Sequence, residues 1–334
     1  MSAHVLMMFT DALYFGVCGF IFVVLLPLLR AGPARAAWRR VSGSETGVVS
    51  MLLLGLFLLI GLADSLHLPQ LMGGERGTSV LDSLLHRFLS GDRQSYVNPV
   101  AVSMLEQSFK GVRSAWLVGM GGVVAWLPLT VLAGVAAGLA GGVLGRMVGF
   151  ACDVLDAIPD VLLLVMLLFA AQPLIGALAE YFSGAVNAGE ARLLVICIAL
   201  GFVRGPALCR RVRARTAEFM ASDAVAAARC MGVSDAQLLR RHLLPELASM
   251  AAVAVVTAFP MLMVAEAVLS YLGMGLDPVT RSLGTVLSDA LAIAATEPSA
   301  GAVLMAALLP LGLMLAAASL FAFSVSSTFG RERH

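Results

Sequence analysis

The chain has 334 residues, of which 60% are hydrophobic and only 13% are charged, and its mean hydropathy is +0.93. A soluble chain is typically about 25% charged because its surface must be hydrated, so this composition excludes a soluble enzyme, a disordered tail and a disulfide-stapled secreted module. The same low share of charged residues excludes a nucleic-acid binder with a large basic field and leaves a membrane protein. The balance of 22 basic and 21 acidic residues, a net charge of +1, indicates nothing about partners.

Seven stretches without Asp, Glu, Lys or Arg are the candidate membrane spans. A helix needs about 20 residues to cross about 30 Å of hydrocarbon, and every stretch except the fifth approaches or exceeds that length. The fifth spans only if Arg204 lies near an interface and the helix continues through Leu208. In chain order the stretches are 12–29, 46–63, 114–145, 161–179, 193–203, 247–265 and 298–330.

The first stretch is interpreted as a retained helix rather than a signal peptide. Asp11 precedes it without any Lys or Arg, and Arg30 follows it as a stop signal. Placing the loop after this stretch in the cytoplasm also puts most basic residues of the chain on the cytoplasmic side. We therefore expect an outside N-terminus and a cytoplasmic C-terminus.

The outer segment 69–114 is predicted to contain a short amphipathic helix, because apolar residues recur there at helical spacing. That helix would cap the pathway, provide a docking surface or simply connect two spans. Its apolar residues are Leu81, Leu84, Leu85 and Phe88. The five cysteines lie in predicted spans or on the cytoplasmic side, and the five histidines share no ligand spacing, so we expect neither a structural disulfide nor a metal site.

Two glycine ladders in the third stretch predict close helix packing, since residues four apart share a helix face. They are Gly134, Gly138, Gly142 and Gly141, Gly145, Gly149. Three carboxylates follow before the fourth stretch, at Asp153, Asp156 and Asp160. They are expected to pair with cytoplasmic arginines such as Arg146 or Arg204, and substrate contact is the alternative.

The cytoplasmic segment between the fifth and sixth stretches has the signals of two short helices. Ser222 and Asp223 supply N-cap chemistry, the run 224–229 favours helix, and Gly232 supplies a left-handed stop. The predicted product is a rigid bend below the membrane. It would dock in a groove of another protein and transmit movement; a solvated amphipathic loop is the alternative.

The second of these helices has both a start signal and an end signal in the sequence. Ser234 and Gln237 form a capping-box pattern, and a helix over 236–243 is expected to end before Pro245.

This segment resembles the EAA loop of ABC-type importer permeases, whose pattern is E-A-A-x3-G-x9-I-x-L-P. The matching residues are Ala226-Ala227-Ala228, then Gly232, then His242-Leu243-Leu244-Pro245. Further stretches resemble the peptide-transporter branch (OppC/DppC-like subunits): Gly111 and Arg113-Ser114, Asp153 to Pro159, and Glu266 to Gly275, which is similar to E-x-x-L-S-F-L-G-L-G. Ala226 stands where the family has glutamate, and a G-T-D-x-x-G-R-D segment is not recognisable before the second core helix.

The resemblance implies an all-α polytopic membrane protein with the type I ABC importer transmembrane fold, six core helices and one extra N-terminal helix. Residues 1–45 would hold the extra helix and a basic loop, 46–114 the first core helix and the outer segment, and 115–334 the permease core with a coupling loop at about 210–246. The implied function is half of the pathway of an ATP-driven importer for oligopeptides, dipeptides or a related solute in the bacterial inner membrane.

The resemblance also implies partners and site residues. The partners are a second homologous permease in a heterodimer, two cytoplasmic ATPases, an extracytoplasmic binding protein and the lipid bilayer, but no nucleic acid. The residues expected to couple the permease to the ATPases are Ala226, Ala227, Ala228, Arg229, Gly232, His242, Leu244 and Pro245. The residues expected to line the pathway or a subunit interface are Glu266, Ser270, Tyr271 and Gly273. For Glu266, contact with lipid headgroups is the alternative.

No catalytic residue, cofactor or metal is expected in this chain. It lacks the phosphate loop G-x-x-x-x-G-K-[ST], so ATP and Mg²⁺ would be bound by partner subunits. Three alternatives stay open: a permease for a non-peptide solute such as nickel or a metal chelate, an ATP-independent secondary transporter, and an intramembrane enzyme. The last two are disfavoured because we find neither an internal repeat nor a convergent catalytic group.

Overall fold

The computed structural model describes residues 13–16, 18–19, 41–66, 79–81, 84–85, 98–181, 188–276, 281–296 and 300–330. Within those ranges the chain forms helices and no strand. Six of the helices are long and apolar enough to cross a membrane. They are α3 (Glu45–Ser65), α5 (Pro99–Ala140), α7 (Asp160–Tyr181), α8 (Ala188–Met220), α11 (Leu244–Tyr271) and α13 (Ala300–Gly330).

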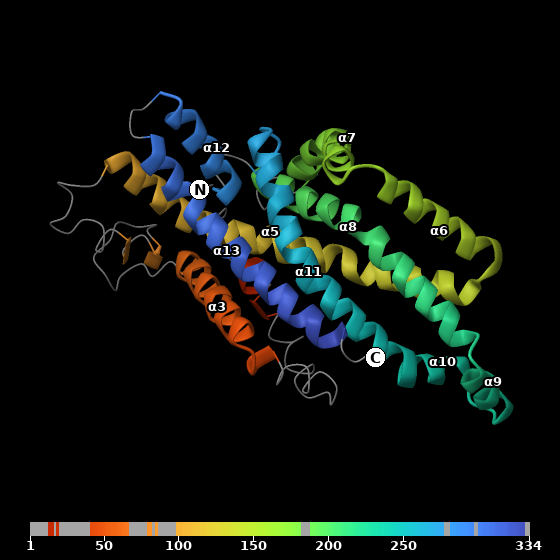
Figure 1. The fold of residues 1–334 in the computed structure, drawn as a ribbon. Coiled ribbons are helices and arrows are strands. Elements are labelled where there is room, and N and C mark those ends of the chain that lie inside the picture. Colours follow the sequence, from red (N-terminus) through yellow and green to blue (C-terminus); the bar gives the residue numbers. More distant parts are fainter. Residues whose placement is uncertain are drawn as a thin grey trace.

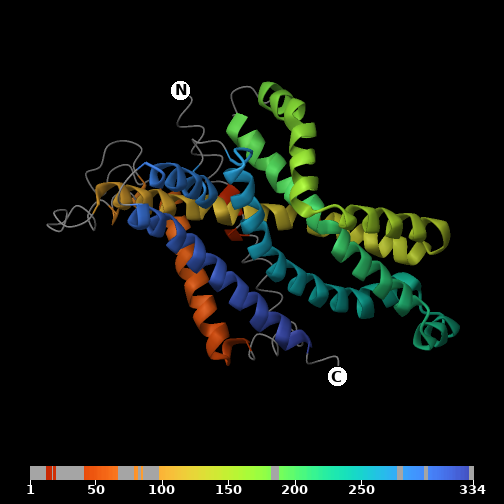
Figure 2. The ribbon, with the colours of Figure 1, turned by 45° about the horizontal axis from the view of Figure 1, so that its top comes forward.

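Shorter helices connect these spans. They are α6 (Gly142–Ala157), α9 (Asp223–Cys230), α10 (Asp235–Leu238), a π-helical turn η1 (Leu239–Leu243) and α12 (Leu283–Ala294). In Figure 1, α12 lies against the start of α5, whereas α9 and α10 lie at the far end of α8. The turned view in Figure 2 keeps the same two groups at opposite ends of the molecule, with α3 beside α13.

The most extensive helix pair is α5 with α8, and glycines allow its close approach. A Cβ atom at Gly134 would lie 2.8 Å from the Val212 Cβ, and one at Gly138 would lie 2.6 Å from the Thr216 Cβ. Bare glycine faces let two backbones approach closely in a membrane. The packing role predicted for Gly134 and Gly138 is therefore confirmed, whereas Gly142, the third member of that ladder, begins α6 and a Cβ there would meet nothing within 4 Å. The fifth span does continue well past Leu208 to Met220.

The predicted third span, 114–145, is wrong at both ends. α5 already begins at Pro99, where the Asn98 side chain accepts a hydrogen bond from the Val100 N–H at 2.9 Å, so much of the expected outer segment is helical. α5 ends at Gly141 and Gly142, whose φ angles of +55° and +50° are left-handed values that suit glycine. The chain reverses there, and α6 runs back beside α5.

The second glycine ladder lies on the other side of this reversal: Gly145 and Gly149 are buried four residues apart in α6, and Gly141 is the N-cap of that helix. A Cβ at Gly145 would lie 2.8 Å from the Ala137 carbonyl oxygen of α5, and one at Gly149 would lie 2.9 Å from the Arg213 guanidinium of α8. These glycines therefore pack α6 against both neighbouring helices.

The first core helix, α3, is fixed at both of its ends. The Ser44 and Ser324 hydroxyl oxygens lie 3.3 Å apart where α3 starts and α13 finishes. At the other end the Asp64 carboxylate lies 3.4 Å from the Arg113 guanidinium of α5. α3 and α13 are therefore antiparallel.

Most of the extra N-terminal helix, predicted over 12–29, lies outside the described residues, as does Phe88 of the predicted outer helix. Tyr14 is described and is fully buried. Its hydroxyl donates to the Leu58 carbonyl oxygen at 2.9 Å and lies against Gly61. The N-terminal segment therefore packs on α3 at this point.

Replacing Gly138 by leucine should destabilise the folded chain, because the larger side chain would overlap both Thr216 and the Arg213 carbonyl. Overpacking of this kind costs about 1–3 kcal/mol. We expect a melting temperature several degrees lower in detergent. Gly176→Leu in α7 is the matched control, since a Cβ at Gly176 would meet nothing within 4 Å. Equal melting temperatures for the two variants would contradict this packing.

Candidate functional site

The bent segment, defined here as residues 223–243, turns at Gly232 as predicted. The φ angle of Gly232 is +83°. The Val233 N–H donates to the Ala228 carbonyl at 3.1 Å, and the Gly232 N–H donates to the Arg229 carbonyl at 2.9 Å. This pair of hydrogen bonds is a Schellman motif, which ends α9 and fixes the direction in which the chain leaves it.

An ion pair closes the bend from outside. Two N–H groups of the Arg229 guanidinium donate to the Asp235 carboxylate: Nε to Oδ1 at 2.8 Å and Nη2 to Oδ2 at 3.2 Å. The paired geometry gives directional strength, although both side chains are about half exposed and the energetic gain is modest. The pair joins α9 to α10 and neutralises the charge of Arg229.

The two predicted N-caps differ in the structure. The Ser234 hydroxyl accepts from the Gln237 N–H at 3.4 Å, in the capping direction. Ser222 occupies the N-cap position of α9, but its hydroxyl donates to the Phe219 carbonyl oxygen at 2.7 Å instead. Ser222 therefore fastens the start of the bent segment to the end of α8.

The predicted helix end before Pro245 is wrong, because the chain continues through η1 directly into α11. The Leu244 N–H donates to the Leu239 carbonyl oxygen, a five-residue step. Pro245 then lies in the first turn of α11, where its missing N–H is tolerated. The bent segment is thus joined to a membrane-spanning helix without an intervening loop.

A second ion pair holds the base of the bent segment. Arg215 near the end of α8 donates to Glu246 in the first turn of α11, from Nε at 2.6 Å and from Nη2 at 3.0 Å. Both side chains are one-third exposed. Apolar side chains complete this base: Val225, Leu238, Leu243 and Leu247 are buried. This pair was not predicted from the sequence, although oppositely charged residues beside the two ends of a polar segment were a usable signal.

α8 also carries ion pairs to α6 and α7. The predicted pairing of three carboxylates with cytoplasmic-side arginines is confirmed, but two of them pair with Arg210 rather than with Arg146 or Arg204. Arg146 instead donates to the Gly142 carbonyl oxygen of its own helix at 3.2 Å. The pairs are Arg204–Asp160 at 3.0 Å, Arg210–Asp153 at 3.0 Å and Arg210–Asp156 at 2.7 Å. Movement of α8 would therefore carry α6 and the start of α7.

The structure separates the sequence-predicted site residues into two groups at the two ends of α11. The 28 residues of α11 span about 40 Å at 1.5 Å per residue. At the bent segment Ala226, Ala227, Arg229, Gly232, His242, Leu244 and Pro245 are exposed and Ala228 is partly exposed. At the other end Glu266 and Ser270 are buried, whereas Tyr271 and Gly273 are exposed.

Glu266 is buried in this structure, where the end of α11 meets α12. Its exposed fraction is only 2%. The Ser270 hydroxyl donates to Glu266 Oε1 at 2.7 Å, and the Ser270 and Ser282 oxygens lie 3.4 Å apart. α12 folds back over the end of α11 and buries this cluster, with Gly284 against the Ala267 backbone.

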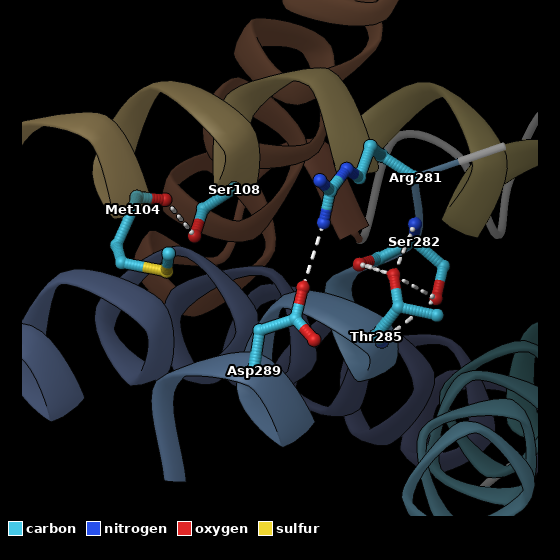
Figure 3. Close-up of polar contacts among 6 residues, drawn as sticks. All are labelled: Met104, Ser108, Arg281, Ser282, Thr285 and Asp289. Atoms are coloured by element: carbon cyan, nitrogen blue, oxygen red, sulfur yellow. Dashed lines mark hydrogen bonds and ion pairs between the residues drawn. The ribbon is translucent and has the colours of Figure 1, made fainter. Parts of the chain in front are cut away.

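The start of α12 is built by the polar contacts in Figure 3. Ser282 and Thr285 form a reciprocal capping box: the Thr285 N–H donates to the Ser282 Oγ at 3.1 Å, and the Ser282 N–H donates to the Thr285 Oγ1 at 2.9 Å. The Arg281 guanidinium pairs with Asp289 at 2.7 Å on the exposed side. These contacts fix the entry of the chain into α12.

α5 provides the surface on which α12 begins. The Ser114 hydroxyl donates to the Arg281 carbonyl oxygen at 2.7 Å, and a Cβ at Gly111 would lie 2.8 Å from the Leu283 nitrogen. One turn earlier, the Ser108 hydroxyl bonds to the Met104 carbonyl at 2.9 Å. Gly111 and Ser114, which carried part of the resemblance, thus have a packing role.

Replacing Glu266 by alanine should destabilise the junction of α11 and α12. The change removes a buried hydrogen-bond acceptor and leaves the Ser270 hydroxyl without it, at a cost of about 1–3 kcal/mol. We expect a lower melting temperature for Glu266→Ala and an unchanged one for Tyr271→Ala, whose side chain is 61% exposed. Equal melting temperatures for the wild type and Glu266→Ala would refute a structural role for this carboxyl group.

Comparison with known proteins places these features in a family. The family described as binding-protein-dependent transport system inner membrane component matches residues 130–329, which include the bent segment and the junction of α11 and α12. The glutathione transport system permease protein GsiD of Pectobacterium atrosepticum is 27% identical over 269 residues, covering 79% of this chain and 82% of that protein.

Two further relatives are covered less completely. The dipeptide transport system permease protein DppC of Lactococcus lactis is 23% identical over 190 residues, covering 57% of this chain and 50% of that protein. The oligopeptide transport system permease protein OppC of Mycobacterium tuberculosis is 26% identical over 202 residues, covering 60% of this chain and 64% of that protein. The family match and the strand-free described helices confirm the predicted type I ABC importer transmembrane fold. The chain belongs to the family of inner membrane components of binding-protein-dependent transport systems.

Proposed function

We propose that this permease forms half of the pathway of an ATP-driven importer and that its bent segment receives the stroke of a partner ATPase. The observation that carries the proposal is the construction of that segment. Its outer surface is exposed, whereas its two ends are fixed to α8 and α11 by the Arg215–Glu246 pair and the continuous π turn. A rigid lever between two spanning helices has the shape that such a transmission needs.

The tip of α9 suits insertion into a protein groove. Ala226 and Ala227 are small and exposed, so they form a slim ridge, and Met231 at the end of that ridge is 77% exposed. A methionine side chain adapts to irregular apolar surfaces. The ridge therefore offers shape and an apolar anchor to a docking partner.

Alternating access follows if ATP changes the position of the docked segment. A ligand shifts the populations of two states of the pathway only if it binds them with different affinity. Closure of two ATPases around ATP would displace α9, and the displacement would pass through η1 to α11 and through Arg215 to α8. The ion pairs of α8 would then carry α6 and α7, opening the pathway outward.

Peptides are the substrate class that the relatives favour. Their names describe transport of glutathione, dipeptides and oligopeptides, and all three solutes contain peptide bonds. We infer the same chemical class for this chain. The remaining partners are a second, related permease and an extracytoplasmic binding protein, with ATP and Mg²⁺ held by the ATPases. The N-terminus would face outward and the C-terminus the cytoplasm.

Reconstitution tests the proposal. The chain is purified with the second permease, the ATPases and the binding protein, and placed in liposomes. We expect uptake of labelled dipeptides or glutathione that requires ATP, the ATPases and the binding protein. Uptake by this permease without any ATPase would sink the proposal, whereas uptake of another solute under the same requirements would correct only the substrate.

A further inference from the structure

The bent segment contains two arginines whose guanidinium groups pair with no other described residue. Eight arginines lie between residues 204 and 246. Six of them have a carboxylate or carbonyl partner, namely Arg204, Arg210, Arg211, Arg213, Arg215 and Arg229. Arg240 and Arg241 have no such partner among the residues that the structure describes. This contrast separates them from a region in which arginines are otherwise consistently paired.

These two guanidinium groups line a surface that faces away from the helix bundle. Arg240 and Arg241 are exposed, and with Ala236 and Gln237 they border an open concavity of about 450 Å³. The intervening Leu238 lies on the opposite face and is buried. Both arginines belong to η1, and π-helical turns of this kind occur frequently at functional sites.

The neighbouring tip of α9 supplies little charge of its own. Ala226 and Ala227 carry no charge, and the charge of Arg229 is neutralised by Asp235 at 2.8 Å. The tip can therefore offer shape and apolar contact, but it gives a partner few charges to recognise. Electrostatic complementarity is what usually directs encounter and excludes wrong partners at a protein interface.

We propose that Arg240, Arg241 and the concavity beside them form an ionic docking surface for carboxylates of the partner ATPase. Guanidinium groups bind carboxylates through paired hydrogen bonds, and their charge is permanent. The surface is continuous along the chain with the α9 tip, and its Ala236 and Gln237 belong to α10, on the α9 side of η1. This inference rests on the proposed function of the bent segment and adds to it the charges that select the ATPase.

The test is the double variant Arg240→Glu, Arg241→Glu in the complete complex. We expect at least tenfold weaker binding of the ATPases in a titration against the reconstituted permease pair, with uptake restored when the ATPases are added in excess. The wild-type affinity should also fall as salt is raised, because salt screens exposed charges. Arg146→Glu is the control: Arg146 is also exposed, on α6, and among the described residues its guanidinium bonds to the Gly142 carbonyl of its own helix alone.

Two results would overturn the inference without touching the proposed function. One is wild-type uptake together with an unchanged ATPase affinity in the double variant. The other is a deficit that appears in nanodiscs containing anionic phosphatidylglycerol and vanishes in pure phosphatidylcholine, since the arginines would then bind lipid headgroups. A deficit of equal size in both lipids supports the ATPase contact. Failure of the proposed function itself would appear earlier, as absence of ATP-driven uptake by the wild-type complex.

Discussion

Gly232→Val is expected to abolish ATP-driven uptake while the chain still inserts and folds. The φ angle of Gly232 is +83°, and a Cβ there would meet nothing within 4 Å, so the damage is confined to the backbone. A side chain in this left-handed conformation costs roughly 1–2 kcal/mol, and more for a β-branched one. Relief of that strain would break the two hydrogen bonds that end α9, and the orientation of α9 relative to α10 would change.

The experiment measures uptake in proteoliposomes and the melting temperature of the same preparation. Gly232→Asn is the matched variant, because asparagine tolerates the left-handed conformation, and it should retain most of the uptake. Gly176→Val, at an open helical position in α7, should behave as wild type. Full uptake by Gly232→Val would show that the direction of the bend is unimportant.

Arg215→Met is expected to uncouple hydrolysis from transport. Arg215 joins α8 to α11 through the hydrogen bonds to Glu246 at 2.6 and 3.0 Å, so its loss frees the base of the bent segment. Hydrogen bonds to charged groups are worth about 1.5–3 kcal/mol, and one-third exposure of both side chains favours the lower limit. Since 1.4 kcal/mol corresponds to a factor of about ten, we expect a roughly tenfold fall in solute moved per ATP hydrolysed.

The ratio of uptake to phosphate release in one preparation reports this uncoupling directly. Arg211→Met is the control, since within the described part of the chain the Arg211 guanidinium bonds to the Ala207 carbonyl of its own helix alone, at 3.1 Å. The exchanged pair Arg215→Glu, Glu246→Arg should recover part of the ratio. A ratio in Arg215→Met equal to that of the wild type would mean that the pair is not part of the transmission.

Features that depend on a few adjacent residues were predictable from the sequence. The spans follow from charge-free runs, because hydrocarbon thickness translates directly into helix length. The turn at Gly232 follows from a local stop signal, and the packing of Gly134 and Gly138 follows from their shared helix face. In each case neighbouring residues carry the physical constraint, so no distant contact is needed to decide it.

Features set by distant contacts were not predictable. The break between α5 and α6 falls at Gly141 and Gly142 inside an apolar run, where hydropathy gives no boundary. The burial of Glu266 depends on α12 returning over it through Ser282. Pro245 signals a helix end, but it lies in the first turn of α11, where its missing N–H is tolerated, and η1 leads directly into that helix.

The most direct test is photo-crosslinking from the tip of α9. A benzophenone amino acid replaces Met231, which is 77% exposed, and in a separate sample Tyr181, which is 84% exposed at the end of α7 opposite the bent segment. In the complete complex we expect residue 231 to capture an ATPase subunit with a yield that changes on ATP addition, and residue 181 to capture none. An ATPase captured from residue 181 but not from residue 231 would contradict the account.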